Sequence, residues 1–537
     1  MPKITLNKKV LENLIGKKLP LDELKNRISY LGTDLESIEG NDITVEIFPN
    51  RPDMLSEQGF ARALAAFIGA KPGLRSYPVK KSEHRVIIES SVKKVRPYTA
   101  CALVKNLHAT DEKIREVINI QEKLHITYGR NRKKAAIGIY PFDKIKTPIY
   151  YKALPKEKII FKPLGSLKKM NAVQILREHP VGREYGYLLE GLDTYPIFID
   201  SENRILSMPP IINSHDTGKI TTLTKDVFIE CSGFDLDTLT VLLNIIVSAL
   251  ADMGGDIYSM NLYYGAKKIV TPDLKPKKMK LDKNYVNKLL GLQLRESDIK
   301  KWLRRMGFDY VNKNVLIPAY RADILHPIDL IEDVAIAYGY EHFNPEIAAV
   351  STIAREANFE SIKRKIQEAL IGFGLLETCS FSIMNKELIK KMKLTVNCLA
   401  LKNPLSKEFD VLRPSLLPSL LHILSENQHH EYPQRLFEIN TVIDEYEKVH
   451  LGIVFSHEKA YFTELKQILD ALCGALGLSY SLVPQELPSF IEGRAGDIFV
   501  NKRFIGVIGE IHPEVLVNFN LGNPVVALEL NLDSLYL

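Results

Sequence analysis

Residues 318–333 read PAYRADILHPIDLIED, and this stretch predicts the end of a strand, a turn and the start of a helix. Pro327 suits the first helical turn, because its φ is fixed near the helical value and the N–H that it lacks would have no helical partner there. Four acidic residues gather around this turn: Asp323, Asp329, Glu332 and Asp333. The last three share one helix face, and Asp323 can fold back toward them.

Carboxylates crowded in this way repel one another, and a hard divalent cation would remove the repulsion. Mg²⁺ suits such a site, since it prefers oxygen ligands and keeps several waters. The alternative is that acids in a first helical turn only complement the positive end of the helix dipole. Spacing alone leaves both interpretations open.

The bulk properties indicate an ordinary globular protein of several domains. The chain has 537 residues, of which 45% are hydrophobic and 25% charged, and this length predicts three or four domains. We expect no membrane segment and no signal peptide, because no run of eighteen apolar residues occurs and the N-terminus lacks an apolar core. Five scattered cysteines suit a reducing cytoplasm and argue against a cysteine-based zinc site. The net charge of +6 permits an RNA partner without requiring one.

An internal repeat places the acidic stretch in the second of two similar domains. Residues 4–32 match residues 279–307 without a gap, including Gly16 with Gly291 and Gly32 with Gly307. Each copy predicts a helix, a glycine turn, a second amphipathic helix and a strand. We therefore predict two small helix-turn-helix-like α/β domains, at 1–75 and 270–345. The first copy lacks the acidic cluster, so only the second could hold the metal.

A helix-turn-helix also suggests nucleic-acid docking. The second helix of the later copy carries a basic face formed by Lys300, Lys301, Arg304 and Arg305. The same helix has Ile299, Trp302, Leu303 and Met306 on its apolar side. This pattern is typical of an amphipathic helix with a solvated basic face, and we prefer that interpretation to reading of DNA bases.

The middle of the chain, residues 85–265, predicts an α+β domain between two linkers at 71–84 and 265–280. Its most informative segment is SMPPIINSHDTGKI at 207–220. Two prolines favour an extended backbone there, and small polar residues follow two buried isoleucines. The pattern suits a pocket wall, although a polar turn after a core strand would look the same. The basic run at 129–134 could touch a nucleic-acid backbone, but most such runs are only solvated.

Residues 350–537 predict a last domain with an antiparallel α+β sheet. Helical patterns at 359–374 and 463–476 alternate with strand-like runs at 435–443, 450–455, 497–511 and 525–532. Four arginines could in principle clamp ATP phosphates: Arg413, Arg435, Arg494 and Arg503. None lies in a Gly-rich segment, and Glu510 stands where such a segment would need basic charge. The domain therefore shows no phosphate-binding segment of that kind.

Five segments together resemble the beta subunit of phenylalanyl-tRNA synthetase, archaeal and eukaryotic type. They are the runs at 48–53, 209–214, 320–340, 435–439 and 508–513, and they occur in the family's order along the whole chain. The resemblance implies an α+β multidomain protein. It has an editing domain at 85–265 and a C-terminal class II synthetase-like domain that lacks catalysis.

In that family, an α2β2 tetramer attaches phenylalanine to tRNA(Phe) using ATP, which binds to the alpha subunit. The resemblance implies a Mg²⁺ site shared with the alpha subunit, formed here by Asp323, Asp329, Glu332 and Asp333. It also implies hydrolysis of Tyr-tRNA(Phe), with Asn213, Ser214, Thr217 and Asp235 as candidate pocket residues. His215 is a tempting general base, but a surface histidine is the simpler interpretation.

Two other functions compete with this one. A stand-alone nucleic-acid-binding protein would use the paired helix-turn-helix-like units, and a free-standing deacylase would use residues 85–265 alone. Sequence-dependent binding to a nucleic-acid duplex without any other subunit would favour the first of these.

Overall fold

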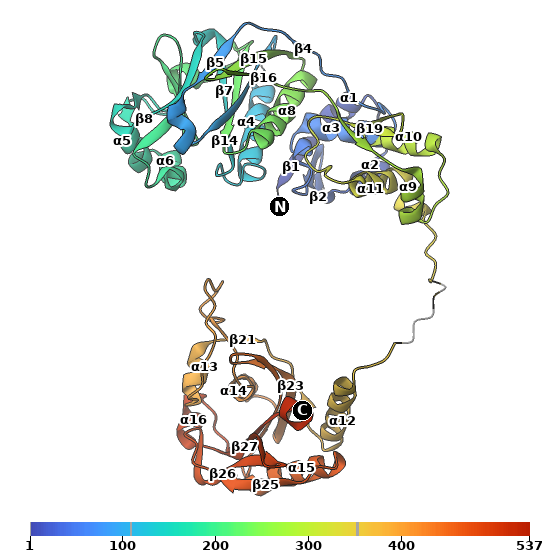
Figure 1. The fold of residues 1–537 in the computed structure, drawn as a ribbon, viewed down its shortest axis with the longest axis vertical. Coiled ribbons are helices and arrows are strands. Elements are labelled where there is room, and N and C mark those ends of the chain that lie inside the picture. The colour runs from blue at the N-terminus through green and yellow to red at the C-terminus, as the bar shows by residue number, and fades with distance from the viewer. Residues whose placement is uncertain (1, 108–109, 349, 351–353, 537) are drawn as a thin grey trace. The chain divides into compact units, whose positions relative to one another are not determined.

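The structure is a computed structural model that describes residues 2–107, 110–348, 350 and 354–536. It is a mixed α+β protein with several separate sheets. The chain divides into two compact units, residues 1–346 and 347–537 (Figure 1). Among the described residues, no helix is long and apolar enough to cross a bilayer.

The predicted internal repeat is present in the first unit. Each copy contains a strand, two helices, a two-stranded hairpin and a further helix, and each sheet is antiparallel with its first strand beside its third. The first copy comprises β1 (Lys3–Asn7), α1 (Lys8–Ile15), α2 (Leu21–Tyr30), β2 (Asp34–Glu39), β3 (Asp42–Glu46), η1 (Pro52–Met54) and α3 (Glu57–Phe67). The second comprises β17 (Lys277–Lys280), α9 (Lys283–Leu290), α10 (Glu296–Arg305), β18 (Asp309–Val311), β19 (Asn314–Ile317), α11 (Pro327–Tyr338) and η6 (Tyr340–His342).

Matching residues start and stop the first helix of each copy. The side chains of Asn7 and Asp282, 275 positions apart in the sequence, accept backbone N–H groups at the helix start. Gly16 and Gly291 end the helices with φ of 81° and 66°, a left-handed conformation that glycine adopts without steric cost. The local sequence thus builds the same unit twice.

Between the two copies lies a domain built on an eleven-stranded mixed sheet, with strand order β13-β12-β11-β8-β5-β15-β6-β14-β7 and with β4 and β16 beside β15. Its strands are β4 (Val79–Lys80), β5 (Arg85–Ile88), β6 (Tyr98–Lys105), β7 (Ala135–Pro141), β8 (Ile149–Pro155), β11 (Thr194–Ile199), β12 (Ile205–Met208), β13 (Ile212–Asn213), β14 (Val227–Gly233), β15 (Asp256–Tyr264) and β16 (Lys267–Thr271). Its helices are α4 (Asp111–Ile126), α5 (Ala172–Glu178), α6 (Pro180–Tyr185), α7 (His215–Gly218) and α8 (Leu236–Asp252). Strands β9 (Ile160–Phe161) and β10 (Met170–Asn171) form a separate pair, and the single turns are η2 (Ser90–Lys94), η3 (Phe142–Lys144), η4 (Lys156–Lys158) and η5 (Gly186–Leu189).

Strand β14 is the centre of this domain. It pairs with both β6 and β7, and all seven of its residues are buried. Side chains alternate along a strand, so Ile229 and Cys231 face the core that contains the leucines of α8. Phe228 faces the other core, with Tyr140 and Leu206. Glu230 alternates with Ile229 and Cys231, and so it lies on the face of Phe228, away from α8.

Part of the predicted linkers is ordered as strand. β4 lies within 71–84, and both β16 and β17 lie within 265–280. β16 pairs with β15 through residues such as Thr271, which pairs with Met260. The prolines and lysines of these segments suggested flexible connections, but backbone pairing with the neighbouring sheets fixes them instead.

The second unit is built on a seven-stranded sheet with order β20-β23-β24-β28-β27-β26-β25. All neighbours are antiparallel except β20 and β23. Its strands are β20 (Leu376–Glu377), β23 (Gln434–Ile443), β24 (Glu447–Ser456), β25 (Tyr480–Pro484), β26 (Phe490–Val500), β27 (Arg503–Ile511) and β28 (Val525–Asn531), and β21 (Ile383–Met384) pairs with β22 (Val411–Leu412). Its helices are α12 (Asn358–Gly372), α13 (Lys386–Lys391), α14 (Leu417–Glu426), α15 (Phe462–Ala475), α16 (Pro513–Asn518) and α17 (Asp533–Tyr536).

Residues 497–511, which the sequence suggested as one strand-like run, are parts of two strands. A turn at Asn501 and Lys502, both with positive φ, separates β26 from β27. Asparagine tolerates that conformation better than most residues. The sequence did not reveal this turn, because apolar residues continue on both sides of it.

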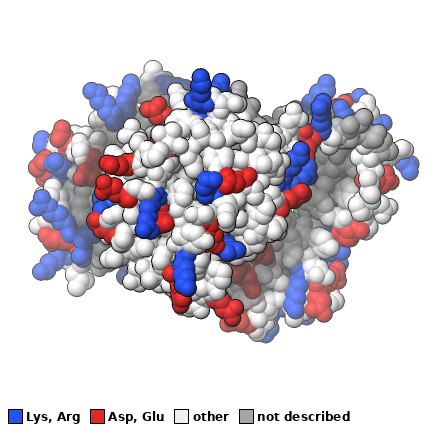
Figure 2. Space-filling model, turned by 90° about the horizontal axis from the view of Figure 1, so that it is seen from below, with Lys and Arg blue, Asp and Glu red and all other residues white. Residues whose placement is uncertain are grey.

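Acidic and basic side chains are mixed on the surface shown in Figure 2. Lys and Arg residues lie beside Asp and Glu residues there, among many uncharged side chains. The net charge of +6 is therefore not gathered into one basic area on that face.

Candidate functional site

Arg321 organises the acidic corner, which we define as Asp323, Asp329, Glu332 and Asp333. Its guanidinium donates to both oxygens of Asp323, over 2.8 and 2.7 Å, and to Oδ2 of Asp333, over 2.7 Å. The Arg321 side chain is 2% exposed, so this charge-assisted pairing takes place away from water. Two of the four acids thus share one cation within the chain.

The other two acids of the corner differ from one another. Oδ2 of Asp329 accepts the backbone N–H groups of Leu325 and His326, each over 2.7 Å, and so it caps the turn and the start of α11. The helix-dipole interpretation therefore describes Asp329. Glu332 is exposed and has no ion pair or hydrogen bond to any described residue, so its carboxylate is available to a ligand from outside.

The four acids do not form a complete metal site in this chain alone. Their oxygen donors suit Mg²⁺, but they are not gathered around one point. Within the described part of the chain, the one group of three or more possible ligands with atoms within 4.8 Å of one another is Asp34, Glu36 and Glu46. That group lies in the first repeat, where Lys3 pairs with Glu36 over 2.8 Å. Magnesium at the acidic corner stays a prediction.

The sequence contained a signal for the role of Arg321. In the first repeat, Arg51 makes the same bidentate contact with Asp53, with both distances 2.9 Å. The Arg-x-Asp spacing thus recurs in both copies at the same point of the fold. Counting only the acids around the turn overlooked the arginine two residues before Asp323.

A pocket of about 190 Å³ lies in the middle domain, and we call it the β14 pocket. Its wall includes Glu122, Arg132, Ser207, Asn213 and Glu230. Asn213 is the one predicted editing residue that lines it. The segment at 209–213 forms part of the wall, as its sequence suggested.

The other three predicted editing residues lie elsewhere. Ser214 and Thr217 are buried, and the Thr217 hydroxyl donates to the backbone oxygen of Ile205 over 3.2 Å. Asp235 is exposed and caps α8 by accepting the backbone N–H of Thr238 over 2.9 Å. The side chains of Thr217 and Asp235 are thus each hydrogen-bonded to a nearby backbone group.

Glu230 is the unusual group of the β14 pocket. It is 2% exposed, its Oε1 accepts the Tyr140 hydroxyl over 3.1 Å, and its Oε2 is buried without a hydrogen-bond partner. Burial raises the pKa of Glu230 to about 8, against the opposing effects of the Tyr140 hydrogen bond and the charge of Arg96. A pKa in that range keeps the carboxyl neutral at neutral pH.

Arg132 supplies a second unsatisfied polar atom to the same pocket. Its guanidinium donates to Glu122 over 3.0 Å and to the backbone oxygen of Ile211 over 2.8 Å, and it stacks on Tyr185 at 4.2 Å. Its Nε is buried without a partner. The pocket therefore offers both an unpaired N–H donor and an unpaired carboxyl oxygen.

His125 lines the β14 pocket but is not free to act as a base. Its Nε2 accepts the backbone N–H of Ile137 over 2.8 Å, and its Nδ1 lies 3.3 Å from Glu122. Because Nε2 is the acceptor, the proton is on Nδ1. Burial lowers the pKa of His125, which also favours the neutral ring. This histidine supports the wall of the pocket.

Sequence reasoning missed Glu230 and Arg132 for different reasons. Glu230 is a single acid within an otherwise apolar and small-residue strand, and a buried acid of that kind is a functional signal. Arg132 belongs to the basic run at 129–134, which we interpreted as solvated. That interpretation is wrong for Arg132, which is 8% exposed.

Comparison with known proteins identifies the family. Residues 345–532 match the model of the phenylalanyl tRNA synthetase beta chain CLM domain, and residues 279–340 match the tRNA synthetase B5 domain. Over its whole length the chain is 40% identical to the phenylalanine–tRNA ligase beta subunit of Thermococcus sibiricus, of which it covers 99%. It is 41% identical to that of Pyrococcus horikoshii, of which it covers 100%.

The chain belongs to the family of phenylalanine–tRNA ligase beta subunits. A crystal structure of an N-terminal fragment of the Pyrococcus horikoshii beta subunit agrees with the first unit, with a TM-score of 0.61 and 41% identity. That fragment is covered completely and corresponds to 63% of this chain. The family places the protein among the aminoacyl-tRNA synthetases, which are ligases of protein biosynthesis. This assignment replaces the alternative that the repeats belong to a stand-alone nucleic-acid-binding protein.

Two basic side chains of α10, the basic helix of the second repeat, make contacts within the chain. Arg305 of α10 donates to the backbone oxygen of Phe67 over 2.7 Å and lies over Trp302 at 5.4 Å. Lys301 lies over the same ring at 4.4 Å. Part of the basic face thus holds the two repeats together.

Proposed function

We propose that this chain works with a separate alpha subunit in an α2β2 assembly that charges tRNA(Phe) with phenylalanine using ATP. We propose further that its β14 pocket hydrolyses Tyr-tRNA(Phe). The second proposal rests on two residues that line the same pocket, Glu230 and Arg132. Each has a buried polar atom without a hydrogen-bond partner, Oε2 of Glu230 and Nε of Arg132. The family supports the first proposal.

Selectivity explains why the β14 pocket suits tyrosine. An apolar site for phenylalanine cannot strongly reject a close analogue that only adds a hydroxyl, whereas a site that hydrogen-bonds the hydroxyl rejects the analogue lacking it. A neutral Glu230 can both donate to and accept from a phenol, beside Tyr140 and Ser207. Phenylalanine has no hydroxyl and would leave the buried oxygen of Glu230 unpaired, which is costly.

Arg132 is suited to hold the other end of the substrate. Its unpaired Nε–H can donate to an ester carbonyl oxygen, while Glu122 and the carbonyl of Ile211 hold the guanidinium in place. Burial opposes ionisation of Glu122, but His125 and Arg132 outweigh it and lower the pKa of Glu122 to about 2. Glu122 therefore remains charged and keeps the arginine fixed over a wide pH range.

The second unit supports catalysis without performing it, because both faces of its sheet are covered. Alternate residues of β24 enter two different cores. Leu451 and Phe455 pack with α12 and α15, whereas Val454 packs with α14 and α16. Among the described strands, the sheet therefore has no open face on which ATP could bind.

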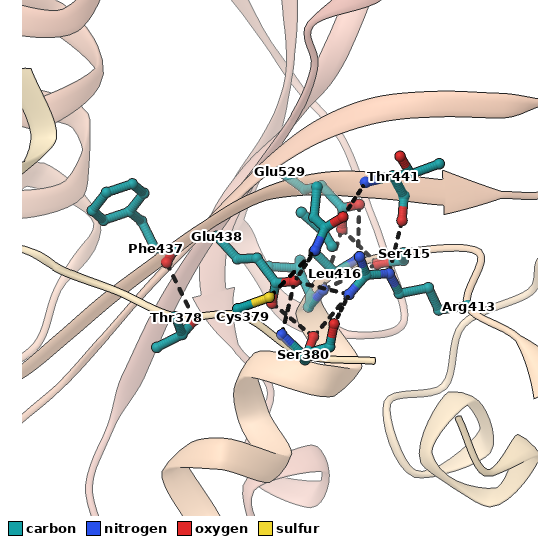
Figure 3. A network of polar contacts seen from close by, with 12 residues as sticks. Thr378, Cys379, Ser380, Arg413, Ser415, Leu416, Phe437, Glu438, Thr441 and Glu529 are labelled. Carbon is teal, nitrogen blue, oxygen red and sulfur yellow. Dashed lines mark hydrogen bonds and ion pairs between the residues drawn. The ribbon is translucent and has the colours of Figure 1, made fainter. Parts of the chain in front are cut away.

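Arginines of the second unit are committed to carboxylates of the same chain. Arg413 is fully buried and donates to Glu438 over 2.9 Å, to the Ser380 hydroxyl over 2.8 Å and to the backbone oxygen of Thr441 over 2.8 Å (Figure 3). Arg435 donates to Glu464 and Arg494 to Glu510, each over 2.6 Å. These three guanidiniums are therefore not available to clamp phosphates.

The second unit also exposes apolar side chains that suit a protein partner. Leu405 is fully exposed, and Phe381 and Leu376 are 74% and 66% exposed. Phe381 also makes an edge contact with Phe409 at 5.8 Å. Contiguous exposed apolar patches mark protein interfaces, and we propose that the alpha subunit covers these side chains.

For the acidic corner, we propose that the partner chain completes the Mg²⁺ site. Glu332 is exposed and unpaired, whereas Asp323 and Asp333 are held by Arg321. A cation would therefore bind through Glu332 first, and ligands from the alpha subunit or water would complete its oxygen shell.

Catalysis of adenylate formation tests the first proposal. The purified chain alone should not exchange pyrophosphate into ATP in the presence of phenylalanine, because three of its four candidate arginines, Arg413, Arg435 and Arg494, are paired with carboxylates. Addition of the alpha subunit should restore the exchange. Exchange by the beta chain alone, at a rate near that of the assembly, would contradict the proposal.

Replacement of Glu230 tests the β14 pocket. In the assembled enzyme, Glu230→Ala should lower kcat/KM for Tyr-tRNA(Phe) about 10-fold or more relative to Phe-tRNA(Phe), since a lost hydrogen bond to a buried group is worth ~1.5 kcal/mol. Glu230→Gln should keep part of the preference, because a neutral amide can replace a neutral carboxyl. Cys231→Ala, a neighbour that faces the other core, is the matched control. An unchanged preference in Glu230→Ala would refute the assignment.

Replacement of Glu332 tests the metal site. With Mn²⁺ as a paramagnetic probe, the assembly should bind the ion tightly and the lone chain weakly, and Glu332→Gln should weaken the binding by the assembly about 10-fold. Thermal stability should change little, because Glu332 forms no hydrogen bond or ion pair with any described residue. Glu296→Gln, which alters an exposed acid in the first turn of α10, is the control. Tight binding retained by Glu332→Gln would exclude this site.

A further inference from the structure

A second and larger cavity lies where the middle domain meets the second repeat, and we call it the junction groove. Its volume is about 700 Å³. The segments 74–81 and 270–276 line it, and residues 318–320 also contribute. The groove is therefore formed by the two connecting segments of the first unit, and it is separate from both the β14 pocket and the acidic corner.

Basic groups exceed acidic groups in the walls of the junction groove. Arg75, Lys81 and Lys275 line it together with Asp273. Arg75 donates to Asp252 over 3.0 Å, but Asp252 is also bound by Arg62 over 2.7 Å, so one carboxylate serves two guanidiniums. The side chains of Lys81 and Lys275 are exposed and have no ion pair to any described residue. Three cations, Arg75, Lys81 and Lys275, thus line the groove with one carboxylate, Asp273, and the excess charge is positive.

The basic character extends along the strands that leave the groove. Between residues 265 and 283 the sequence has seven lysines and two aspartates. Val270 of β16 lines the groove, and Lys268, two residues earlier, lies on the same face of the strand. Lys268 also lies over the ring of Tyr263 at 5.8 Å. Clefts lined by one sign of charge concentrate the field and attract counter-charges.

The remaining walls are apolar and aromatic, although Tyr320 is buried with Arg62 over its ring. Tyr77 and Tyr320 line the groove, as do Pro272, Pro276 and Pro318. The two tyrosine rings meet edge to face at 6.2 Å. Grooves that combine cations with aromatic rings are typical of proteins that hold nucleic-acid strands without reading their sequence, because every base presents a flat face and every nucleotide a phosphate.

We propose that the junction groove binds the phosphodiester backbone of tRNA, with Lys81 and Lys275 as the phosphate contacts. This inference rests on the proposed function, since it assumes that the chain meets tRNA. It assigns a contact outside both the site of hydrolysis and the alpha subunit. The groove adds affinity for tRNA of any sequence, and discrimination between amino acids stays with the β14 pocket.

The salt dependence of binding tests this directly. Lys81→Gln together with Lys275→Gln should weaken binding of a tRNA(Phe) transcript to the full-length chain about 10-fold at low salt. It should also reduce the slope of log Kd against log salt by about 1.4 to 1.8, because each lost phosphate contact removes ~0.7 to 0.9 from that slope. The matched control is Lys168→Gln with Lys169→Gln, which removes two exposed lysines of the same domain. The control should leave the slope unchanged.

Other outcomes are equally informative. An unchanged slope in the Lys81/Lys275 variant, or an equal reduction in the control, would overturn the groove assignment while leaving the β14 pocket intact. Failure of the wild-type chain to bind the transcript would overturn this inference and the RNA partner together. A polyglutamate peptide of matched charge provides the remaining comparison. If the double variant loses affinity for the peptide but not for the transcript, the groove binds an acidic protein segment and the inference is wrong.

Discussion

The requirement that a buried charge has a partner shapes this molecule more than any single contact. Asp252, at the end of α8, accepts from Arg62 of the first repeat and from Arg75 and Tyr77 of the following segment. The guanidinium of Arg62 in turn lies 4.0 Å above the ring of Tyr320 in the second repeat. An unpaired buried charge would cost several kcal/mol. These parts of the first unit are therefore held in one arrangement, which fixes the walls of the junction groove.

The same rule separates structural sites from sites that await a ligand. Arg321 with Asp323 and Asp333, and Arg413 with Glu438, are satisfied within the chain. Glu230 is the contrasting case, because it is buried and forms no ion pair with any described residue. Its pKa rises instead, and it remains as a neutral group with one unpaired oxygen. A protein tolerates that cost where a substrate makes the missing hydrogen bond.

Local patterns in the sequence predicted much of the fold. Gly16 and Gly291 marked the helix ends of two copies, and the long ungapped match predicted the repeat that the structure contains. Patterns that depend on distant partners could not be predicted in this way. Arg321 pairs with two acids of the acidic corner, one of them twelve residues later. Arg132 belongs to a basic run, but its side chain lines the β14 pocket, where it contacts Glu122 and Ile211. Of the predicted editing residues, Asn213 alone lines the β14 pocket, since Asp235 and Thr217 satisfy local backbone groups.

The protonation state of Glu230 tests the account's central claim most directly. The claim is that this carboxyl is neutral and open to a substrate hydroxyl. Infrared titration of the full-length chain, with the spectrum of Glu230→Gln subtracted, isolates its carbonyl band. We predict a protonated carboxyl at neutral pH that ionises only as the pH rises past about 8. A carboxylate that is already ionised at neutral pH, with no protonated band to lose, would contradict the account.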